Sequence, residues 1–254
     1  MLTIDLTNRV AVVTGATGQL GRVMVRTLAQ CGADVAINYF KNQAFAGRLV
    51  EEVQALGRRA IAVQVDVADE SAVLRMQRDV QKALGDPDII VNNAVSQYKW
   101  VGVLEQQVAD YESQYRSCVL HNVLMAKAFV PAMIEKRWGR VVAISTECAM
   151  QNAPTQSAYV SGKRGMDGVL RVLAKEVGPH QITVNQVAPG WTISDQTRKD
   201  GTEKQPHYDE HVPLRRRGTD QEIANVVAFL ASDLASYITG AYVPVCGGAV
   251  MPAI

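Results

Sequence analysis

The chain has 254 residues, of which 20% are charged and 48% are hydrophobic, and its formal net charge is +1 at pH 7. This length and composition are typical of a globular protein with a sizeable core, and the near-neutral charge argues against the broad basic surface that nucleic-acid binding needs. The cysteines lie far apart without a CxxC pair, which predicts neither a zinc site nor a disulfide framework and fits a reducing cytoplasm. They are Cys31, Cys118, Cys148 and Cys246.

The N-terminal residues "MLTIDLTNRVAVVTG" lack a basic segment followed by an apolar core, so no signal peptide is expected. No apolar run approaches the roughly 20 residues of a membrane span. We therefore expect a soluble, cytoplasmic protein that binds neither membrane nor nucleic acid. The basic run Arg215-Arg216-Arg217 is expected to lie on a solvated face or at an oligomer contact.

Short apolar segments alternate with longer segments of helical periodicity. The former are "RVAVVT", "DVAIN", "AIAVQV", "DIIVNN", "GRVVAIS" and "ITVNQVAP"; "AGRLVEEVQALG" and "SAVLRMQRDVQKAL" exemplify the latter. Continuously apolar strands are typical of a parallel sheet buried on both faces. The sequence predicts a single α/β domain over residues 1–254: a doubly wound, Rossmann-like parallel sheet of about seven strands with helices on both faces and a last strand near "AYVPVC".

A glycine-rich turn, "TGATGQLG", follows the first predicted strand and opens a helix from about Gln19 to Cys31. Glycines allow a tight turn and a close approach of backbone to phosphate, and the helix N-terminus attracts the pyrophosphate of a dinucleotide. The alternative is a tight turn that needs glycine for packing alone. The predicted cofactor-binding residues of this turn are Gly15, Thr17, Gly18, Gln19, Leu20 and Gly21.

One long polar segment, residues 192–217, breaks the alternation after the strand in "VNQVAPGW". Ligands of such sheets bind beyond the carboxyl ends of the strands, so an insertion there is a candidate lid over a substrate. The alternative is a surface loop without function.

The stretch "AYVSGKRG" places Tyr159 and Lys163 four residues apart on the helix after the fifth strand. Such residues share a helix face, so the ammonium is expected beside the phenol. A nearby positive charge favours phenolate, and we expect it to lower the pKa of Tyr159 from its usual value of about 10. Such a phenol can exchange a proton with a carbonyl or alcohol oxygen.

With these residues in place, the chain resembles the short-chain dehydrogenase/reductase family from about Asn8 to Gly248, and within it the bacterial 3-oxoacyl-carrier-protein reductases. The signatures, in order, are "TGATGQLG", "VDVAD", "NNAV", "GRVVAIST", "YVSGK", "VNQVAPG" and "YITGAYVPVCGG". The resemblance implies that Tyr159 is the acid/base, that Lys163 lowers its pKa and binds the nicotinamide ribose, and that Thr146 holds the substrate carbonyl where the family normally has serine. Ser145 is an alternative donor, although strand alternation points it the other way.

The resemblance also implies contacts with a cofactor. Asp66 and Val67 would contact the adenine, Asn93 and Ala94 the adenosine ribose, and Pro189, Gly190 and Thr192 the nicotinamide. At the end of the second strand, Tyr39 takes the place of the acid of NAD-preferring relatives, and Lys41 or the amide of Asn42 could bind a 2′-phosphate. We expect NADP, with NAD possible; Lys41 could equally be solvated surface.

Three residues depart from the family pattern. Gln19 replaces a usual glycine, and Val95 replaces another in a position that would crowd the nicotinamide pocket. Cys118 falls where the family has an asparagine that holds a water in the proton relay, and Asn122 lies one turn further on. Cys118 is expected to be a buried, small, apolar residue rather than a redox group.

The expected function is the interconversion of a ketone and a secondary alcohol by hydride transfer. Tyr98, Trp100, Gln151 and Trp191 could line the substrate pocket, and relatives suggest a homotetramer or homodimer. The alternatives are a catalytically silent nucleotide-binding protein, suggested by the three departures, and an epimerase or dehydratase of nucleotide sugars. His207 and His211 have a spacing that can bind metal, but no third ligand is recognisable, so no metal is expected.

Overall fold

The computed structural model describes residues 3–252 and contains one seven-stranded sheet in the order β3-β2-β1-β4-β5-β6-β7. Every strand pairs in parallel with its neighbours. This confirms the predicted fold class. The strands are β1 (Val10–Val13), β2 (Asp34–Tyr39), β3 (Ala60–Gln64), β4 (Ile89–Asn92), β5 (Gly139–Ile144), β6 (Ile182–Pro189) and β7 (Tyr242–Val245).

The strand order reverses between β1 and β4, which are neighbours although two strands separate them in the chain. Val12 of β1 lies opposite Ile90 of β4. All four residues of each strand are buried, as continuous runs of Val and Ile predict for a sheet covered on both faces. A reversal of this kind opens a crevice at the carboxyl ends of the strands, where ligands of open α/β sheets bind.

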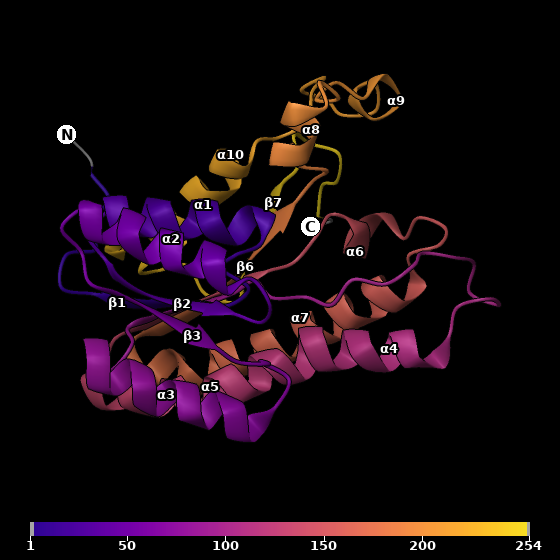
Figure 1. Ribbon diagram of the computed structural model, residues 1–254. Helices are drawn as coiled ribbons and strands as arrows, with labels where there is room; N and C mark the ends of the chain where they lie inside the picture. Colours follow the sequence, from indigo (N-terminus) through magenta and orange to yellow (C-terminus); the bar gives the residue numbers. More distant parts are fainter. Residues whose placement is uncertain (1–2, 253–254) are drawn as a thin grey trace.

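Helices α1 (Gln19–Gln30), α2 (Gln43–Ala55) and α10 (Asp220–Leu230) cover one face of the sheet (Figure 1). Their apolar stripes enclose a core that includes Leu28, Leu49 and Val227, each with no exposed surface. Burial of this kind contributes roughly 1.5–3 kcal/mol for each large aliphatic side chain.

Helices α3 (Glu70–Leu84), α5 (His121–Lys136) and α7 (Ser157–Val177) cover the opposite face. α4 (Val108–Gln114) runs into α5 through η1, a π-helical segment over Tyr115–Leu120. The helical stretch Val108–Lys136 is long and apolar enough, by length and composition alone, to cross a membrane, but 56% of its most apolar window is buried inside the fold. A core helix of a soluble protein passes the same test.

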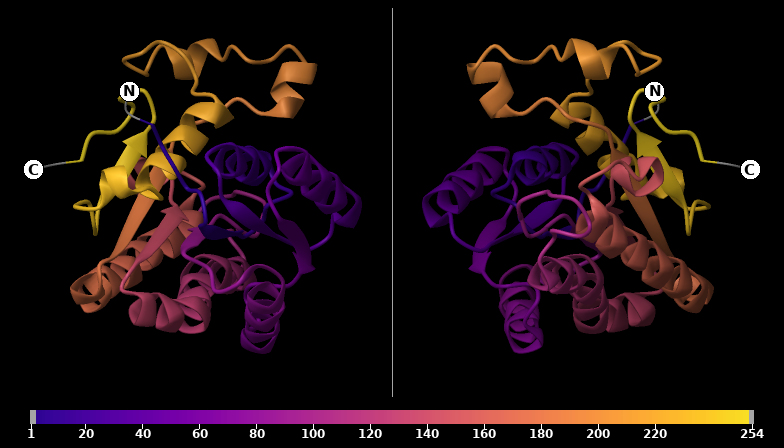
Figure 2. Two further views of the ribbon diagram at one scale, coloured as in Figure 1. Left: turned by 90° about the vertical axis from the view of Figure 1, so that its left-hand side faces the viewer. Right: turned by 90° about the vertical axis from the view of Figure 1, so that its right-hand side faces the viewer.

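The 192–217 segment lies beyond the helix layer that contains α1, α2 and α10 and leads into α10 (Figure 2). It carries the short helices α8 (Asp195–Lys199) and α9 (Pro206–Asp209). The remaining short elements are α6 (Cys148–Gln151), η2 (Gly178–His180) and η3 (Asp233–Ala235).

Candidate active site

The turn after β1 is shaped by glycines that no other residue could replace without movement. Gly15 has φ +58°, and a Cβ atom there would lie 2.9 Å from Cα of Ala94. A Cβ atom on Gly21 would lie 2.4 Å from the carbonyl oxygen of Gly15. The turn therefore packs against both α1 and the chain after β4, and it leaves backbone exposed at the start of α1.

Polar side chains from three strands hold this turn in place. The hydroxyl oxygen of Thr14 accepts hydrogen bonds from the backbone N–H groups of Asn93 (2.9 Å) and Ala94 (3.1 Å). The amide of Asn93 donates to the Thr14 carbonyl at 2.9 Å. Asn38 of β2 accepts from the N–H of Gly15 at 3.2 Å. Asn93 and Ala94 thus brace the turn from β4, and Asn38 is a bracing residue that the sequence did not single out.

A groove of two adjoining pockets runs over this turn. The larger has a volume of about 510 Å³ and the smaller about 240 Å³. The groove fits a dinucleotide, because the glycine-rich turn lies at its floor and the twelve-residue helix α1 begins there without a side-chain cap. Of the predicted cofactor residues, the larger pocket contains Gly15, Thr17, Gly18, Gln19, Leu20, Lys41, Asn93 and Ala94, and the smaller Gly15, Asp66, Val67 and Ala94.

Val95 lines both pockets, so the residue expected to crowd the nicotinamide region lies on the groove wall. Tyr39, another predicted cofactor-binding residue, lines neither pocket. Only 6% of Tyr39 is exposed, and it belongs to the core under α1 and α2. Strand alternation sends Asn38 and Phe40 to the groove and Tyr39 to the opposite side.

Thr146, Tyr159 and Lys163 converge where β5 ends and α7 begins. Thr146 follows Ile144 of β5 by two residues and is 7% exposed. Nζ of Lys163 donates to the carbonyl oxygen of Ile144 at 2.6 Å and lies 5.7 Å from the ring centre of Tyr159. Tyr242 of β7 donates to the carbonyl of Thr146, which fixes the backbone of this residue from the other side.

The pKa of Tyr159 departs from the sequence-based expectation. Burial raises the pKa of the Tyr159 phenol. A hydrogen bond with the Thr146 side chain lowers this pKa, but by less than burial raises it. Burial also lowers the pKa of Lys163. The expected lowering of the Tyr159 pKa by Lys163 is therefore not found, because desolvation of the phenol outweighs the neighbouring ammonium.

Cys118 lies in the π-helical segment η1 and is 1% exposed, as expected of a buried apolar residue. Asn122, one turn later, donates to the carbonyl of Cys118 at 2.7 Å and accepts from the amide of Asn92 at 2.7 Å. Asn122 is thus a structural bridge between β4 and η1.

Two predicted substrate residues come from the loop after β4. The ring of Trp100 stacks on that of Tyr159, with centroids 5.9 Å apart and an interplanar angle of 27°. The hydroxyl oxygen of Tyr98 accepts from the backbone N–H of Tyr159 at 2.7 Å. This N–H belongs to the first turn of α7, whose N-cap, Gln156, makes no side-chain cap, so Tyr98 supplies the missing acceptor.

The end of β6 meets Glu147, which follows Thr146. The hydroxyl of Tyr208 in α9 donates to the Glu147 carboxylate at 2.9 Å and accepts from the N–H of Trp191 at 2.9 Å. A Cβ atom on Gly190 would come within 3.0 Å of that carboxylate and 2.7 Å of the Tyr208 hydroxyl. Gln151 also binds Glu147, and burial raises the pKa of this carboxyl. Trp191 and Gln151 therefore share one corner of the site.

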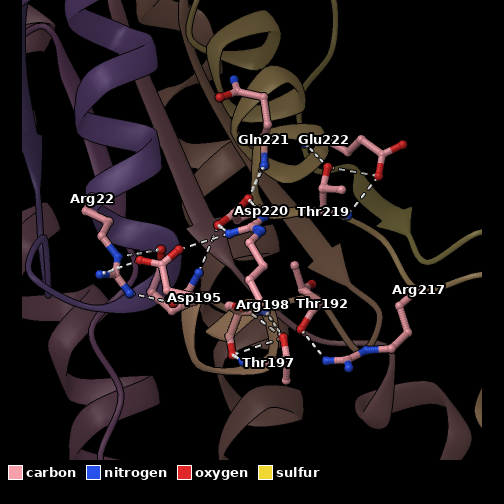
Figure 3. A network of polar contacts seen from close by, with 12 residues as sticks. Arg22, Thr192, Asp195, Thr197, Arg198, Arg217, Thr219, Asp220, Gln221 and Glu222 are labelled. Carbon is pink, nitrogen blue, oxygen red and sulfur yellow. Dashed lines mark hydrogen bonds and ion pairs between the residues drawn. The ribbon is translucent and has the colours of Figure 1, made fainter. Parts of the chain in front are cut away.

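A polar network ties the 192–217 segment to the body of the protein (Figure 3). Arg198 of α8 binds Asp220 through both terminal nitrogens, at 2.8 and 2.6 Å. Asp195 of the same helix pairs with Arg22 of α1 at 2.8 Å. Gln19 donates to Asp220 at 2.8 Å and accepts from the N–H of Asp195 at 3.1 Å. Gln19, which replaces a family glycine, thus connects the glycine-rich turn to the 192–217 segment.

Arg217 corrects the expectation that the run Arg215–Arg217 is a solvated face. Arg215 and Arg216 are exposed, but Arg217 is 2% exposed. Its guanidinium donates to the carbonyls of Trp191 (3.2 Å) and Thr192 (2.7 Å) and lies 4.5 Å from the ring centre of Trp191. The hydroxyl of Thr192 donates to the carbonyl of Gly190 at 3.0 Å. The sequence shows three adjacent arginines of equal charge and therefore could not predict which of them is buried.

The rings of His207 and His211 lie 5.1 Å apart, and Nδ1 of His211 is 2.7 Å from the carbonyl of His207. Across residues 3–252 no group of three or more histidine, cysteine, aspartate or glutamate side chains is placed to hold a metal ion.

The fold and the site together define a Rossmann-type α/β protein with a glycine-rich turn after β1 and a helix that carries Tyr159 and Lys163. Residues 15–250 match the family model described as enoyl-(acyl carrier protein) reductase. The chain is 37% identical over 243 residues to the 3-oxoacyl-[acyl-carrier-protein] reductase FabG of Staphylococcus aureus, covering 95% of this chain and 98% of the relative. It belongs to the short-chain dehydrogenase/reductase family of oxidoreductases.

Solved structures with similar folds agree with this family assignment. A blue fluorescent protein from a metagenomic library, in complex with NADPH, has 33% identity and a TM-score of 0.89, covering 97% of this chain and all of the other. A 7α-hydroxysteroid dehydrogenase complexed with NADH and 7-oxo glycochenodeoxycholic acid has 28% identity and a TM-score of 0.89, covering 98% and 97% of the two chains.

Proposed function

We propose that this protein is an NAD(P)-dependent oxidoreductase that interconverts a ketone and a secondary alcohol by hydride transfer. The observation that carries the proposal is the convergence of Thr146, Tyr159 and Lys163 at the carboxyl end of β5, beside the groove that fits a dinucleotide. The steroid dehydrogenase named above was solved in complex with NADH and a 7-oxo compound, which supports the reaction type.

A nicotinamide cofactor, when bound, would supply or accept the hydride. It would be held by the glycine turn, Asp66, Val67, Asn93 and Ala94, and towards the reacting end by Lys163, Pro189, Gly190 and Thr192. In reduction, Tyr159 donates its phenolic proton to the substrate oxygen, and the hydroxyl of Thr146 donates a hydrogen bond to the same atom. Burial raises the pKa of Tyr159, so the phenol is in the protonated form that this donation requires.

NADP is proposed as the preferred cofactor. The larger pocket is bordered by Phe40, Lys41 and Asn42 and contains no carboxylate that would repel a 2′-phosphate. Lys41→Ala should weaken NADPH binding several-fold while leaving NADH binding within about twofold, because a single ammonium–phosphate contact is lost. Fluorescence titrations of both nucleotides test this. Equal losses for the two would leave Lys41 as solvated surface.

The substrate is proposed to enter between Tyr98, Trp100, Gln151 and Trp191. Residues 192–217 would form a lid over it, and the whole chain would be one domain.

We also propose a cytoplasmic homotetramer or homodimer. An apolar groove of about 670 Å³ between α5 and α7, which includes Val130, Val169 and Val172, supports self-association. Light scattering of Val172→Glu, a change on the 56% exposed Val172, should show a smaller species.

A catalytically silent, nucleotide-binding homologue is the second candidate. Cys118 at the position of the family asparagine and the stacking of Trp100 over Tyr159 favour it. NADPH and NADH titrations followed by a ketone panel separate the two candidates, with Tyr159→Phe as the matched control. Turnover that falls by at least about 100-fold in Tyr159→Phe supports the enzyme. Tight nucleotide binding without turnover of any ketone supports silence.

A further inference from the structure

Trp100 contacts the candidate acid/base and is nevertheless open to solvent. Its ring stacks on that of Tyr159, with centroids 5.9 Å apart, and 44% of its surface is exposed. Aromatic side chains supply much of the contact area in ligand pockets. Because the indole lies against the ring that carries the phenol, its exposed surface borders the space that a ketone must enter to reach the Tyr159 hydroxyl.

The loop that carries Trp100 is braced by a buried amide, so the exposure of the indole does not result from a loose chain. The side chain of Gln106, which is 8% exposed, donates to the carbonyl of Lys99 at 3.2 Å and accepts from the N–H of Val101 at 3.3 Å. The same amide donates to the carboxylate of Asp110 in α4 at 2.5 Å. Gln106 thus fixes the backbone on both sides of the indole.

Two further hydrogen bonds attach this loop to the helices beside it. Gln114 of α4, with no exposed surface, donates to the carbonyl of Ser96 at 2.9 Å. The Tyr98 hydroxyl accepts from the N–H of Tyr159 in α7 at 2.7 Å. A side chain on a backbone held in this way loses little freedom when a ligand covers it, and such preorganised contacts bind more tightly. The indole is therefore suited to serve as a fixed flat surface.

The charge beside the Tyr159 ring narrows the chemistry of the ligand. An indole face attracts flat aromatic rings, and it also attracts cations. Nζ of Lys163 lies 5.7 Å from the centre of the Tyr159 ring, the ring on which Trp100 stacks. Lys163 is 3% exposed, so little water screens its charge, and it would repel a cation at this place. A neutral aromatic ring meets no such repulsion.

Resting on the proposed function, we propose that Trp100 is a specificity-determining residue and that the substrate is a neutral ketone with a flat aromatic ring near its carbonyl group. The aromatic ring lies on the exposed indole surface, and the ketone oxygen meets the hydroxyls of Tyr159 and Thr146. Gln106 is a positioning residue that holds the indole for this contact.

The first test compares phenylacetone with cyclohexylacetone, two ketones of the same length of which only the first has a flat ring. Wild type should have a kcat/KM about 2–12-fold higher for phenylacetone. In Trp100→Leu, which keeps an apolar side chain without a flat surface, the ratio between the two ketones should fall to about 1. Leu104→Ala, a change on a fully exposed residue of the same loop, should keep the wild-type ratio.

The second test measures binding without turnover, by saturation-transfer NMR in the presence of NADP, which cannot reduce a ketone. Phenylacetone should bind wild type about 2–12-fold more tightly than cyclohexylacetone, and this preference should disappear in Trp100→Leu. A cationic ketone, 4-(trimethylammonio)-2-butanone, should bind more weakly than phenylacetone. Tighter binding of the cationic ketone overturns the neutral substrate.

A ratio between phenylacetone and cyclohexylacetone that is the same in wild type and Trp100→Leu overturns the role of Trp100. A smaller species of Trp100→Leu in light scattering also overturns it, because the indole would then be a contact between copies of the chain. If Trp100→Leu does not fold, an absence of preference in wild type still overturns the proposal. If wild type reduces no ketone, the proposed function fails, and the binding measurement separately decides whether the site takes an aromatic ligand.

Discussion

The side-chain amide of Gln19 donates to the carboxylate of Asp220 at 2.8 Å, and this bond joins the start of α1 to the start of α10. The same side chain accepts from the backbone N–H of Asp195 in α8. A glycine at this position would make neither contact. Gln19 therefore makes the glycine-rich turn an attachment point for the 192–217 segment.

Removing this attachment should loosen the segment while the sheet stays intact. Gln19→Ala loses three hydrogen bonds, to Asp220, Asp195 and Arg22, worth together about 1.5–4.5 kcal/mol. Arg198 still neutralises Asp220. We expect faster tryptic cleavage after Arg198 and Lys199 and a lower urea midpoint. Gln196→Ala is the matched control, because the amide of Gln196 binds only Asp200 on the exposed side of α8. Equal cleavage rates in the two variants would contradict this role of Gln19.

Much of this architecture could be predicted from the sequence because its signals are local. Unbroken apolar strands such as Val10–Val13, the glycine turn and the spacing of Tyr159 and Lys163 each follow from neighbouring residues. The parallel sheet and the position of the helix that carries the Tyr–Lys pair were therefore predictable.

What could not be predicted depends on contacts between residues distant in the chain. Tyr39 aligns with the acid of NAD-preferring relatives, and this alignment predicts a position in the groove. Strand alternation instead turns the Tyr39 side chain into the core. The pKa of Tyr159 depends on desolvation by several elements, which an i,i+4 spacing does not reveal. Burial of Arg217 likewise follows from the path of the 192–217 segment.

Tyr98 offers a test of how the helix that bears Tyr159 is held. Its hydroxyl is the acceptor for the N–H of Tyr159, so Tyr98→Phe leaves a first-turn donor of α7 without its partner. We expect a loss of about 1–2 kcal/mol in the free energy of urea unfolding and a fall in kcat larger than the change in KM. Tyr115→Phe, on a 53% exposed side chain, should be neutral. A stability of Tyr98→Phe equal to that control would show that water replaces the hydroxyl.

Arg217 is expected to be the strongest single support of the 192–217 segment. Arg217→Met removes charge-assisted hydrogen bonds to the carbonyls of Trp191 and Thr192 and leaves both without this donor. Destabilisation should be about 2–4 kcal/mol, with faster hydrogen exchange throughout residues 192–217. Arg215→Met, at an exposed position, should change the unfolding free energy by less than about 0.5 kcal/mol. Unaltered exchange in Arg217→Met would mean that the segment is held elsewhere.

His121 should make folding stability fall as the solution is acidified. Its pKa is lowered from 6.5 to about 4 in the folded protein, so between these values the unfolded chain binds a proton that the folded protein does not. Stability therefore rises with pH across this window, by about 3 kcal/mol at about 1.4 kcal/mol for each pKa unit.

Urea unfolding of wild type and His121→Gln from pH 4 to pH 7 measures this contribution as the difference between the two slopes. Glu147 titrates in the opposite sense, because burial raises its pKa, and it is common to both proteins, so it cancels in the comparison. His207→Gln should keep the wild-type slope. Parallel curves for wild type and His121→Gln would show that burial does not lower the pKa of the His121 ring.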